Sequence, residues 1–179
     1  MRDITAYYWF NQYFSKEEIE KIHDIANKQP YIKAETFGAD DDYRRSKIKW
    51  LSFSEDTEWI YQKLIHAMAE ANSEEFGFDW TGATEAIQFT TYDSGDKGHY
   101  DWHMDVTPSN QNRKISAVVL LNDDYEGGKL EIDGKNLEGT VGAGNVIIFP
   151  SYMLHKVQEV IKGTRNSLVV WGIGEEPFK

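Results

Sequence analysis

The 179-residue chain contains no cysteine, which excludes disulfide bonds and thiolate metal sites. It also lacks a long apolar run, because the longest, residues 117–121, is far shorter than the roughly 20 residues that a membrane-spanning helix needs. The opening residues, Met1-Arg2-Asp3-Ile4, do not form the apolar stretch of a secretory signal. We therefore expect a cytoplasmic protein without a membrane segment.

Basic residues are also scarce, with 19 Lys and Arg against 30 Asp and Glu and a net charge of -11. Proteins that bind nucleic acid rely on Lys and Arg to neutralise phosphates, so this chain disfavours a nucleic-acid substrate. Hydrophobic residues make up 40% of the chain and aromatic residues 14%, which is enough for a folded core. The length fits a single domain spanning residues 1–179.

The front of the chain, about residues 1–80, carries the pattern of two helices. Ser15 and Glu18 have the spacing of a capping box, and the apolar positions that follow predict a helix over residues 16 to about 28. A second helix is expected to begin near Ser54 and to end before Gly77. We expect both helices to pack one face against the rest of the domain.

From about residue 84 to residue 174 the pattern changes to short strands separated by glycine-rich turns. The expected strands cover residues 86–92, 99–106, 114–121, 129–132, 146–149, 155–161 and 167–173. Many short strands with such turns are typical of an antiparallel sandwich or barrel. The sequence therefore predicts a mainly β domain with flanking helices.

The most informative pattern is formed by His103, Asp105, His155 and Arg165. Two histidines and one carboxylate can hold one face of an iron(II) ion and leave positions open for substrate and dioxygen. Residues two apart on a strand project to the same side, so His103 and Asp105 point together, and His155 can join them from a strand across the barrel. Arg165 can then bind the distal carboxylate of an organic acid through paired hydrogen bonds.

Three alternatives remain open at this point. His99 and Asp101 form a second His-x-Asp pair in the same register, and periodicity does not choose between the two pairs. Zinc can occupy such a site and activate water for hydrolysis, although Arg165 then has no clear role. The chain can also be a jelly-roll protein that binds a ligand without catalysis.

A resemblance to a known family favours an oxygenase. Residues 92–105, Tyr-Asp-Ser-Gly-Asp-Lys-Gly-His-Tyr-Asp-Trp-His-Met-Asp, resemble 2-oxoglutarate- and iron(II)-dependent oxygenases of the prolyl 4-hydroxylase-like type, most closely their bacterial and phage members. The resemblance continues through residues 125–130, 144–151 and 163–167 to Trp171. It implies a double-stranded β-helix, which is a jelly-roll barrel with helices packed on one side.

The same resemblance implies roles for the residues of the pattern. His103, Asp105 and His155 would be the iron ligands, which favours the second His-x-Asp pair. Arg165 would bind the distal carboxylate of 2-oxoglutarate, and Ser167 would share that carboxylate from the same face of the strand.

Further residues are implied for the pocket. Tyr92 and Tyr100 match tyrosines that line it in relatives, and Leu120 stands where some relatives carry a tyrosine that contacts the cosubstrate. Trp171 matches a tryptophan near the iron and the target side chain, in the place where nucleic-acid repair demethylases usually carry a second arginine.

A smaller set of residues is expected to contact the substrate. Arg44 and Ser46 resemble part of a substrate-covering loop in plant and algal relatives, with a basic surface loop as the alternative. Gln88 shares the parity of Tyr92 along its strand and can therefore reach the same pocket.

The activity that the resemblance implies is hydroxylation of an unactivated carbon, most simply in a peptidyl prolyl side chain, with oxidative decarboxylation of 2-oxoglutarate to succinate and CO2. Asp105 fits this activity, because related halogenases carry a small residue in its place. The cofactors are then iron(II), 2-oxoglutarate and dioxygen, with ascorbate as a candidate reductant. The sequence leaves open whether the substrate is a peptide, a protein or a small molecule, and which oligomeric state the protein adopts.

Overall fold

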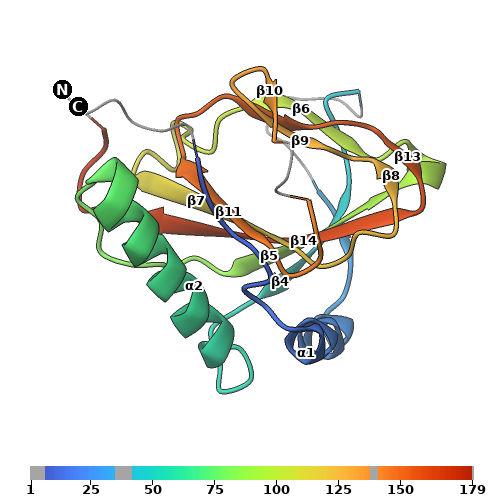
Figure 1. Ribbon diagram of the computed structural model, residues 1–179, viewed down its shortest axis with the longest axis horizontal. Helices are drawn as coiled ribbons and strands as arrows, with labels where there is room; N and C mark the ends of the chain where they lie inside the picture. Colours follow the sequence, from blue (N-terminus) through green and yellow to red (C-terminus); the bar gives the residue numbers. More distant parts are fainter. Residues whose placement is uncertain (1–6, 35–41, 138–140, 179) are drawn as a thin grey trace.

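The computed structural model describes residues 7–34, 42–137 and 141–178. The outermost residues of the expected domain, 1–6 and 179, lie outside the described part. Two facing sheets form the body of the molecule, and two helices cover the outer face of the larger sheet (Figure 1).

The larger sheet has seven strands and the smaller one has five. The order in the larger sheet is β1 (Tyr8–Phe10), β11 (Val146–Pro150), β7 (Arg113–Leu120), β14 (Thr164–Ile173), β5 (Ile87–Asp93), β4 (Lys47–Leu51) and β2 (Ile32–Lys33). The order in the smaller sheet is β10 (Lys135–Asn136), β9 (Leu130–Ile132), β12 (His155–Val157), β6 (His99–His103) and β3 (Arg44–Arg45). A separate ribbon pairs β13 (Val160–Lys162) with β8 (Glu126–Gly127). These pairs are antiparallel, which confirms the predicted jelly-roll fold, although the sheets do not close into a barrel.

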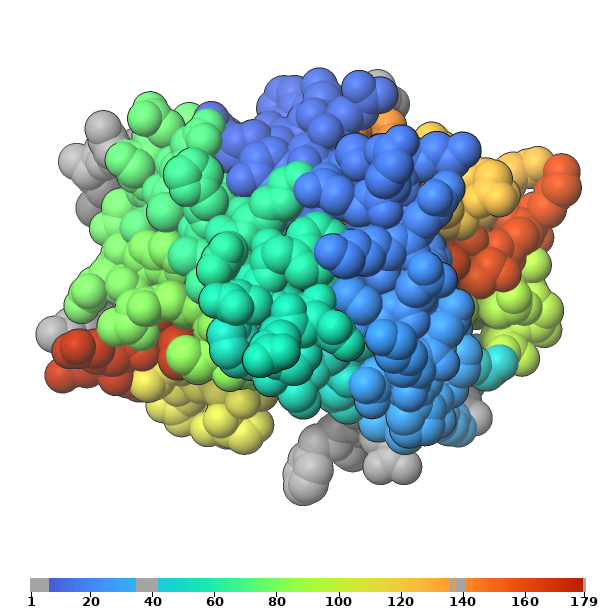
Figure 2. Space-filling view, turned by 90° about the horizontal axis from the view of Figure 1, so that it is seen from below, coloured from blue at the N-terminus to red at the C-terminus, as the bar shows by residue number. Residues whose placement is uncertain are grey.

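The capping box predicted at Ser15 is present and starts helix α1 (Lys16–Asn27). Glu18 N–H donates to Ser15 Oγ at 3.2 Å, and the Ser15 backbone N–H donates to Glu18 Oε2 at 2.8 Å. Helix α2 (Glu58–Ala71) continues into a π-helical turn (Asn72–Phe76) that ends at Gly77, as expected. Figure 2 shows the N-terminal part of the chain, which contains both helices, spread over this face of the molecule.

Alternation along the central strands divides the interior into two apolar clusters. On β7, Ala117 and Val119 face the helices, whereas Val118 and Leu120 face the smaller sheet. Strands β5, β11 and β14 follow the same rule, so along these strands alternate side chains enter the space between the sheets. This alternation determines which residues of β5 and β14 line the site.

The structure differs from the expected strands in several places. Strand β6 ends at His103 and not at residue 106, and β8 and β10 were not expected. The front segment also supplies β1 to β4, which are so short that periodicity hardly marks them. Residues 155–161 form two strands because the chain changes partner, since β12 pairs with β6 and β9 whereas β13 pairs with β8. Strand β14 begins at Thr164 rather than Ser167 and therefore includes Arg165.

Neither helix in the described residues combines the length and the apolar character that crossing a bilayer requires.

Candidate active site

A cavity of about 870 Å³ opens between the two sheets. Its walls contain His103, Asp105 and His155 together with Arg165 and Arg44. The cavity therefore brings together the metal-binding pattern and Arg165, which follows Asp105 by 60 residues in the sequence.

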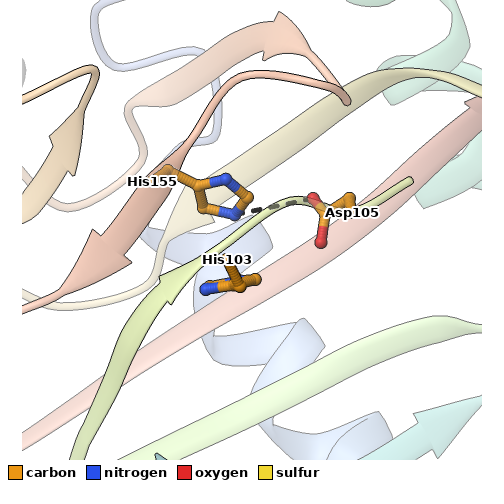
Figure 3. A group of neighbouring side chains, drawn as sticks. All are labelled: His103, Asp105 and His155. Atoms are coloured by element: carbon orange, nitrogen blue, oxygen red, sulfur yellow. Dashed lines mark ion pairs between the residues drawn. The ribbon is translucent and has the colours of Figure 1, made fainter. Parts of the chain in front are cut away.

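The side chains of the three predicted metal ligands lie close together (Figure 3). His103 ends β6 and lies directly opposite His155 on the neighbouring strand β12. One ligand atom from each of His103, Asp105 and His155 lies within 4.8 Å of the others, and His155 Nε2 is 3.6 Å from Asp105 Oδ2. His155 thus reaches the group from the adjacent strand of the same sheet, not from across the barrel as expected, because β6 and β12 pair directly.

Backbone carbonyls orient both histidine rings. His103 Nδ1 lies 2.7 Å from the carbonyl oxygen of Asp101, and His155 Nδ1 lies 2.9 Å from that of Met153. A carbonyl oxygen can only accept, so each Nδ1 carries a proton, which leaves the lone pair of a neutral ring on Nε2. Both rings therefore present Nε2 as a ligand atom, which is the arrangement that a bound metal requires.

Asp105 is held by two serines that the sequence analysis did not single out. Ser116 Oγ donates to Asp105 Oδ2 at 2.6 Å and lies 2.9 Å from Ser151 Oγ. The Asp105 backbone N–H donates to the Ser151 carbonyl at 2.9 Å. The only signal in the sequence was a single serine inside the apolar strand β7.

The protonation states also suit a cation. Burial and the neighbouring His155 lower the pKa of His103 to about 3, so this ring is neutral at pH 7. Burial raises the pKa of Asp105, but His155, His103, Ser116 and Trp171 together outweigh it and lower that pKa below its usual value. The group therefore offers one carboxylate and at least one neutral imidazole to a metal ion.

The competing pair, His99 and Asp101, is engaged elsewhere. His99 Nδ1 lies 2.8 Å from the Lys97 carbonyl and Nε2 lies 2.9 Å from the Asp42 carbonyl, so neither ring nitrogen is free for a metal. The Asp101 carboxylate is exposed and accepts the backbone N–H of Trp102. Of the two pairs, the cavity contains only His103 and Asp105.

Arg165 is among the largest fully buried side chains, with 1% of its surface exposed. Its Nη1 donates to Ser167 Oγ at 3.0 Å, whereas Nε and Nη2 have no hydrogen-bond partner among the described residues. Its Cζ lies 5.5 Å from the centre of the Tyr92 ring. A buried cation with two unsatisfied donors is costly, which indicates that an anion binds there.

Of the remaining residues predicted for 2-oxoglutarate, Tyr92 and Tyr100 line the cavity. The Tyr100 ring stacks on His103, with centroids 3.5 Å apart. Leu120 is buried beside Tyr92 in the apolar cluster between the sheets and is not part of the cavity wall. Contact of Leu120 with a cosubstrate stays a prediction.

Three of the four residues predicted for substrate, Arg44, Ser46 and Gln88, form a connected polar group. Arg44 and Gln88 line the cavity. Ser46 does not line it, but its Oγ accepts a hydrogen bond from Arg44 Nε. Trp171 also lines the cavity and stacks under Arg113, whose guanidinium carbon lies 3.7 Å from the ring centroid. Arg113 was not singled out in the sequence, because nothing near it in the chain marks its position in the wall.

The comparisons with known proteins agree with this geometry. Residues 87–172 match the family described as the 2OG-Fe(II) oxygenase superfamily. A PKHD-type hydroxylase of Picosynechococcus sp. is 42% identical over 77 residues, which cover 40% of this chain and 35% of that protein. A second one, of Idiomarina loihiensis, is 33% identical over 90 residues, which cover 48% of this chain and 40% of that protein. The chain therefore matches about two fifths of the length of these curated relatives.

Solved structures resemble the whole fold at low sequence identity. A prolyl-4-hydroxylase of Pseudomonas putida superposes with a TM-score of 0.76 at 17% identity, over 96% of this chain and 94% of that chain. A viral collagen prolyl hydroxylase from Paramecium Bursaria Chlorella virus-1 reaches 0.71 at 18% identity, over 95% and 97%. Residues 87–172 are therefore similar to the 2OG-Fe(II) oxygenase superfamily, and the chain has a prolyl 4-hydroxylase-like fold.

Proposed function

We propose that this protein is an iron(II)- and 2-oxoglutarate-dependent hydroxylase. His103, Asp105 and His155 would hold the metal, and Arg165 would bind the distal carboxylate of 2-oxoglutarate. The observation that carries the proposal is the buried guanidinium of Arg165, which lacks an anionic partner and shares one cavity with a two-histidine, one-carboxylate group.

The donor set fits iron(II). Two imidazole nitrogens and one carboxylate oxygen occupy three positions and leave the others open, which is the arrangement of non-haem iron oxygenases. Met153 and Asp101 fix the imidazoles through their carbonyls, and Ser116 fixes the carboxylate. When bound, iron(II) supplies the dioxygen chemistry that hydroxylates an unactivated carbon and decarboxylates 2-oxoglutarate to succinate and CO2.

The residues of the chain orient the two reactants and exclude water. Arg165 and Ser167 offer hydrogen-bond donors to a carboxylate in a space walled by Tyr92 and Val118. The apolar wall keeps the carboxylate away from solvent and strengthens its attraction to the guanidinium. A single bound orientation of the cosubstrate would result.

For the substrate we propose a peptidyl side chain of the prolyl type. The open side of the cavity carries Trp50, Met104 and Leu154, whose apolar side chains are partly exposed, and such a rim can receive a short peptide. Arg44, Gln88 and Trp171 lie on the cavity wall and would contact that substrate.

Anaerobic titration with iron(II) and 2-oxoglutarate tests the proposal through the visible charge-transfer band of the chelated complex. We expect the band in the native protein, its loss in His103→Ala, and its retention in the matched control His99→Ala. In Arg165→Ala, the 2-oxoglutarate concentration needed for half of the band should rise about 30-fold or more, because a buried charged contact costs ~2–5 kcal/mol. A native protein that binds zinc(II) but forms no band with iron(II) and 2-oxoglutarate would overturn the proposal.

A further inference from the structure

A second buried guanidinium lies in the same cavity. Arg44 is 8% exposed, and its Nε donates to Ser46 Oγ at 2.8 Å. Its Nη2 donates to Gln88 Oε1 at 2.9 Å, and its Cζ lies 4.4 Å from the centre of the Tyr100 ring. All three partners are neutral, so none of them compensates the charge.

Arg44 and Arg165 differ in this respect from the other described arginines. Within the described residues, Arg113 is paired with Glu85 and Arg45 with Asp42. Arg44 and Arg165 make no ion pair with a described carboxylate, and both line the cavity. In a chain with 30 acidic residues, the two buried arginines without a carboxylate partner lie on the walls of the same pocket. Lys49 and Lys114 are also buried without a described carboxylate partner, but they do not line that pocket.

Gln88 holds the Arg44 guanidinium in place without compensating its positive charge. The amide oxygen of Gln88 accepts from Arg44 and also from Thr90 Oγ1 at 3.1 Å. It thereby fixes the guanidinium by hydrogen bonding without adding a negative charge. A buried cation held only by neutral groups produces a positive potential in the cavity and attracts an anion.

The position of Arg44 separates it from the proposed cosubstrate site. Arg44 belongs to β3 of the smaller sheet, whereas Arg165 belongs to β14 of the larger sheet. Arg44 contacts the face of Tyr100, and that ring stacks on His103. Arg44 therefore lies beside the metal-binding group, in the part of the cavity left for a substrate when Arg165 holds 2-oxoglutarate.

We propose that the substrate carries a carboxylate close to the carbon that is hydroxylated, and that Arg44 binds this carboxylate. This inference rests on the proposed function for the identity of the reaction. Two sources of the carboxylate share the same chemistry, namely an acidic residue next to the target in a peptide and the free carboxylate of an amino acid.

Isothermal titration calorimetry tests the inference. The protein is loaded with zinc(II), which is redox-inert, and saturated with 2-oxoglutarate so that Arg165 is occupied. The probes are two matched pairs: acetyl-Ala-Pro-Glu-amide against acetyl-Ala-Pro-Gln-amide, and free L-proline against L-prolinamide. We expect the carboxylate member of one pair to bind about 10- to 100-fold more tightly, as a charge-assisted hydrogen bond predicts. The pair that responds identifies the source of the carboxylate.

Three variants assign the preference to Arg44. Arg44→Gln should reduce the ratio of the two affinities to about one, and Gln88→Glu should do the same by giving Arg44 an internal carboxylate. Arg45→Gln, which removes the same charge from the next residue, outside the cavity wall, should leave the ratio unchanged. Because Gln88→Glu keeps Arg44 in place, it also separates loss of the anion site from misfolding.

Equal affinity within both pairs, absence of binding by all four probes, or a preference that persists in both Arg44→Gln and Gln88→Glu would overturn the inference. Failure of the proposed function is seen separately, as absence of zinc(II) or 2-oxoglutarate binding before any probe is added. In that case the same titrations on metal-free protein still decide whether Arg44 selects a carboxylate.

Discussion

At the scale of single residues, hydrogen bonds to uncharged groups fix the orientation of the two histidine rings and of the Asp105 carboxylate. The carbonyls of Asp101 and Met153 leave Nε2 free on both histidines. Ser116, which is itself hydrogen-bonded to Ser151, holds the buried carboxylate of Asp105. Asp101 and Met153 each precede their histidine by two residues, whereas Ser116 lies on β7 and Ser151 directly after β11, so spacing along the sequence does not reveal the two serines.

Ser116 is predicted to act as a positioning residue for Asp105. Ser116→Ala removes the 2.6 Å hydrogen bond and leaves the carboxylate free to rotate, so the affinity for a divalent metal should fall about 10- to 100-fold. Titration with cobalt(II) or zinc(II) measures this without any turnover. Ser116→Thr, which keeps the hydroxyl, should recover most of the affinity, and a metal affinity unchanged in Ser116→Ala would refute the role.

At the scale of elements, the sequence predicted best what is encoded locally. The capping box at Ser15 and the apolar face behind it predicted α1 almost to the residue, and Gly77 marked the end of the second helix. Strands β2 and β3 have only two residues each and exist because of their partners β4 and β6. Their formation depends on pairing with strands distant in the chain, which no local pattern encodes.

The cap of α1 should stabilise the protein in a pH-dependent way. Burial raises the pKa of Glu18, but the hydrogen bond from Lys63 and the Ser15 backbone N–H outweigh it and lower the pKa below 4.5. A carboxyl with a lowered folded-state pKa contributes stability above its unfolded pKa and loses it as the pH falls through the folded value. Glu18→Gln should therefore reduce the free energy of unfolding by about 1 kcal/mol at pH 7, with a smaller difference below pH ~4.

Urea denaturation at pH 7 and at pH 3 measures the effect of Glu18→Gln. Glu20→Gln, an exposed position on the same helix, is the matched control and should change stability little at either pH. An equal loss at both pH values would show that the Glu18 charge is not the source.

At the scale of the whole molecule, the chain is acidic, yet its cavity is lined by two arginines that make no ion pair with a described carboxylate. The composition correctly indicated that the chain as a whole is acidic, but it gave no sign that Arg44 and Arg165 are buried without carboxylate partners. Their burial follows from the alternation of β14 and from the pairing of β3 with β6. The positive interior is therefore a product of the fold and not of the composition.

This charge distribution predicts a conflict between stability and binding. Arg165→Met replaces a buried, unsatisfied cation by an apolar side chain of similar length, so the ligand-free protein should gain about 1–4 kcal/mol in unfolding free energy. The same variant should lose the thermal stabilisation that 2-oxoglutarate gives to the native protein. Thermal unfolding with and without 2-oxoglutarate measures both effects.

Arg113→Met is the contrasting variant for this experiment. Arg113 is paired with Glu85 and stacked on Trp171, so its loss leaves a carboxylate without its partner and should destabilise the protein. A loss of stability in Arg165→Met comparable to that in Arg113→Met would show that Arg165 is already compensated in the ligand-free protein.

The division of the cavity between two sheets has a consequence for the size of the cosubstrate. The histidines stand on β6 and β12 of the smaller sheet, and Arg165 stands on β14 of the larger one. A dicarboxylate that binds the metal with one end and Arg165 with the other would span the gap between the sheets. The protein would then select its cosubstrate by carbon number, excluding the shorter oxaloacetate and the longer 2-oxoadipate because neither can reach both ends without strain.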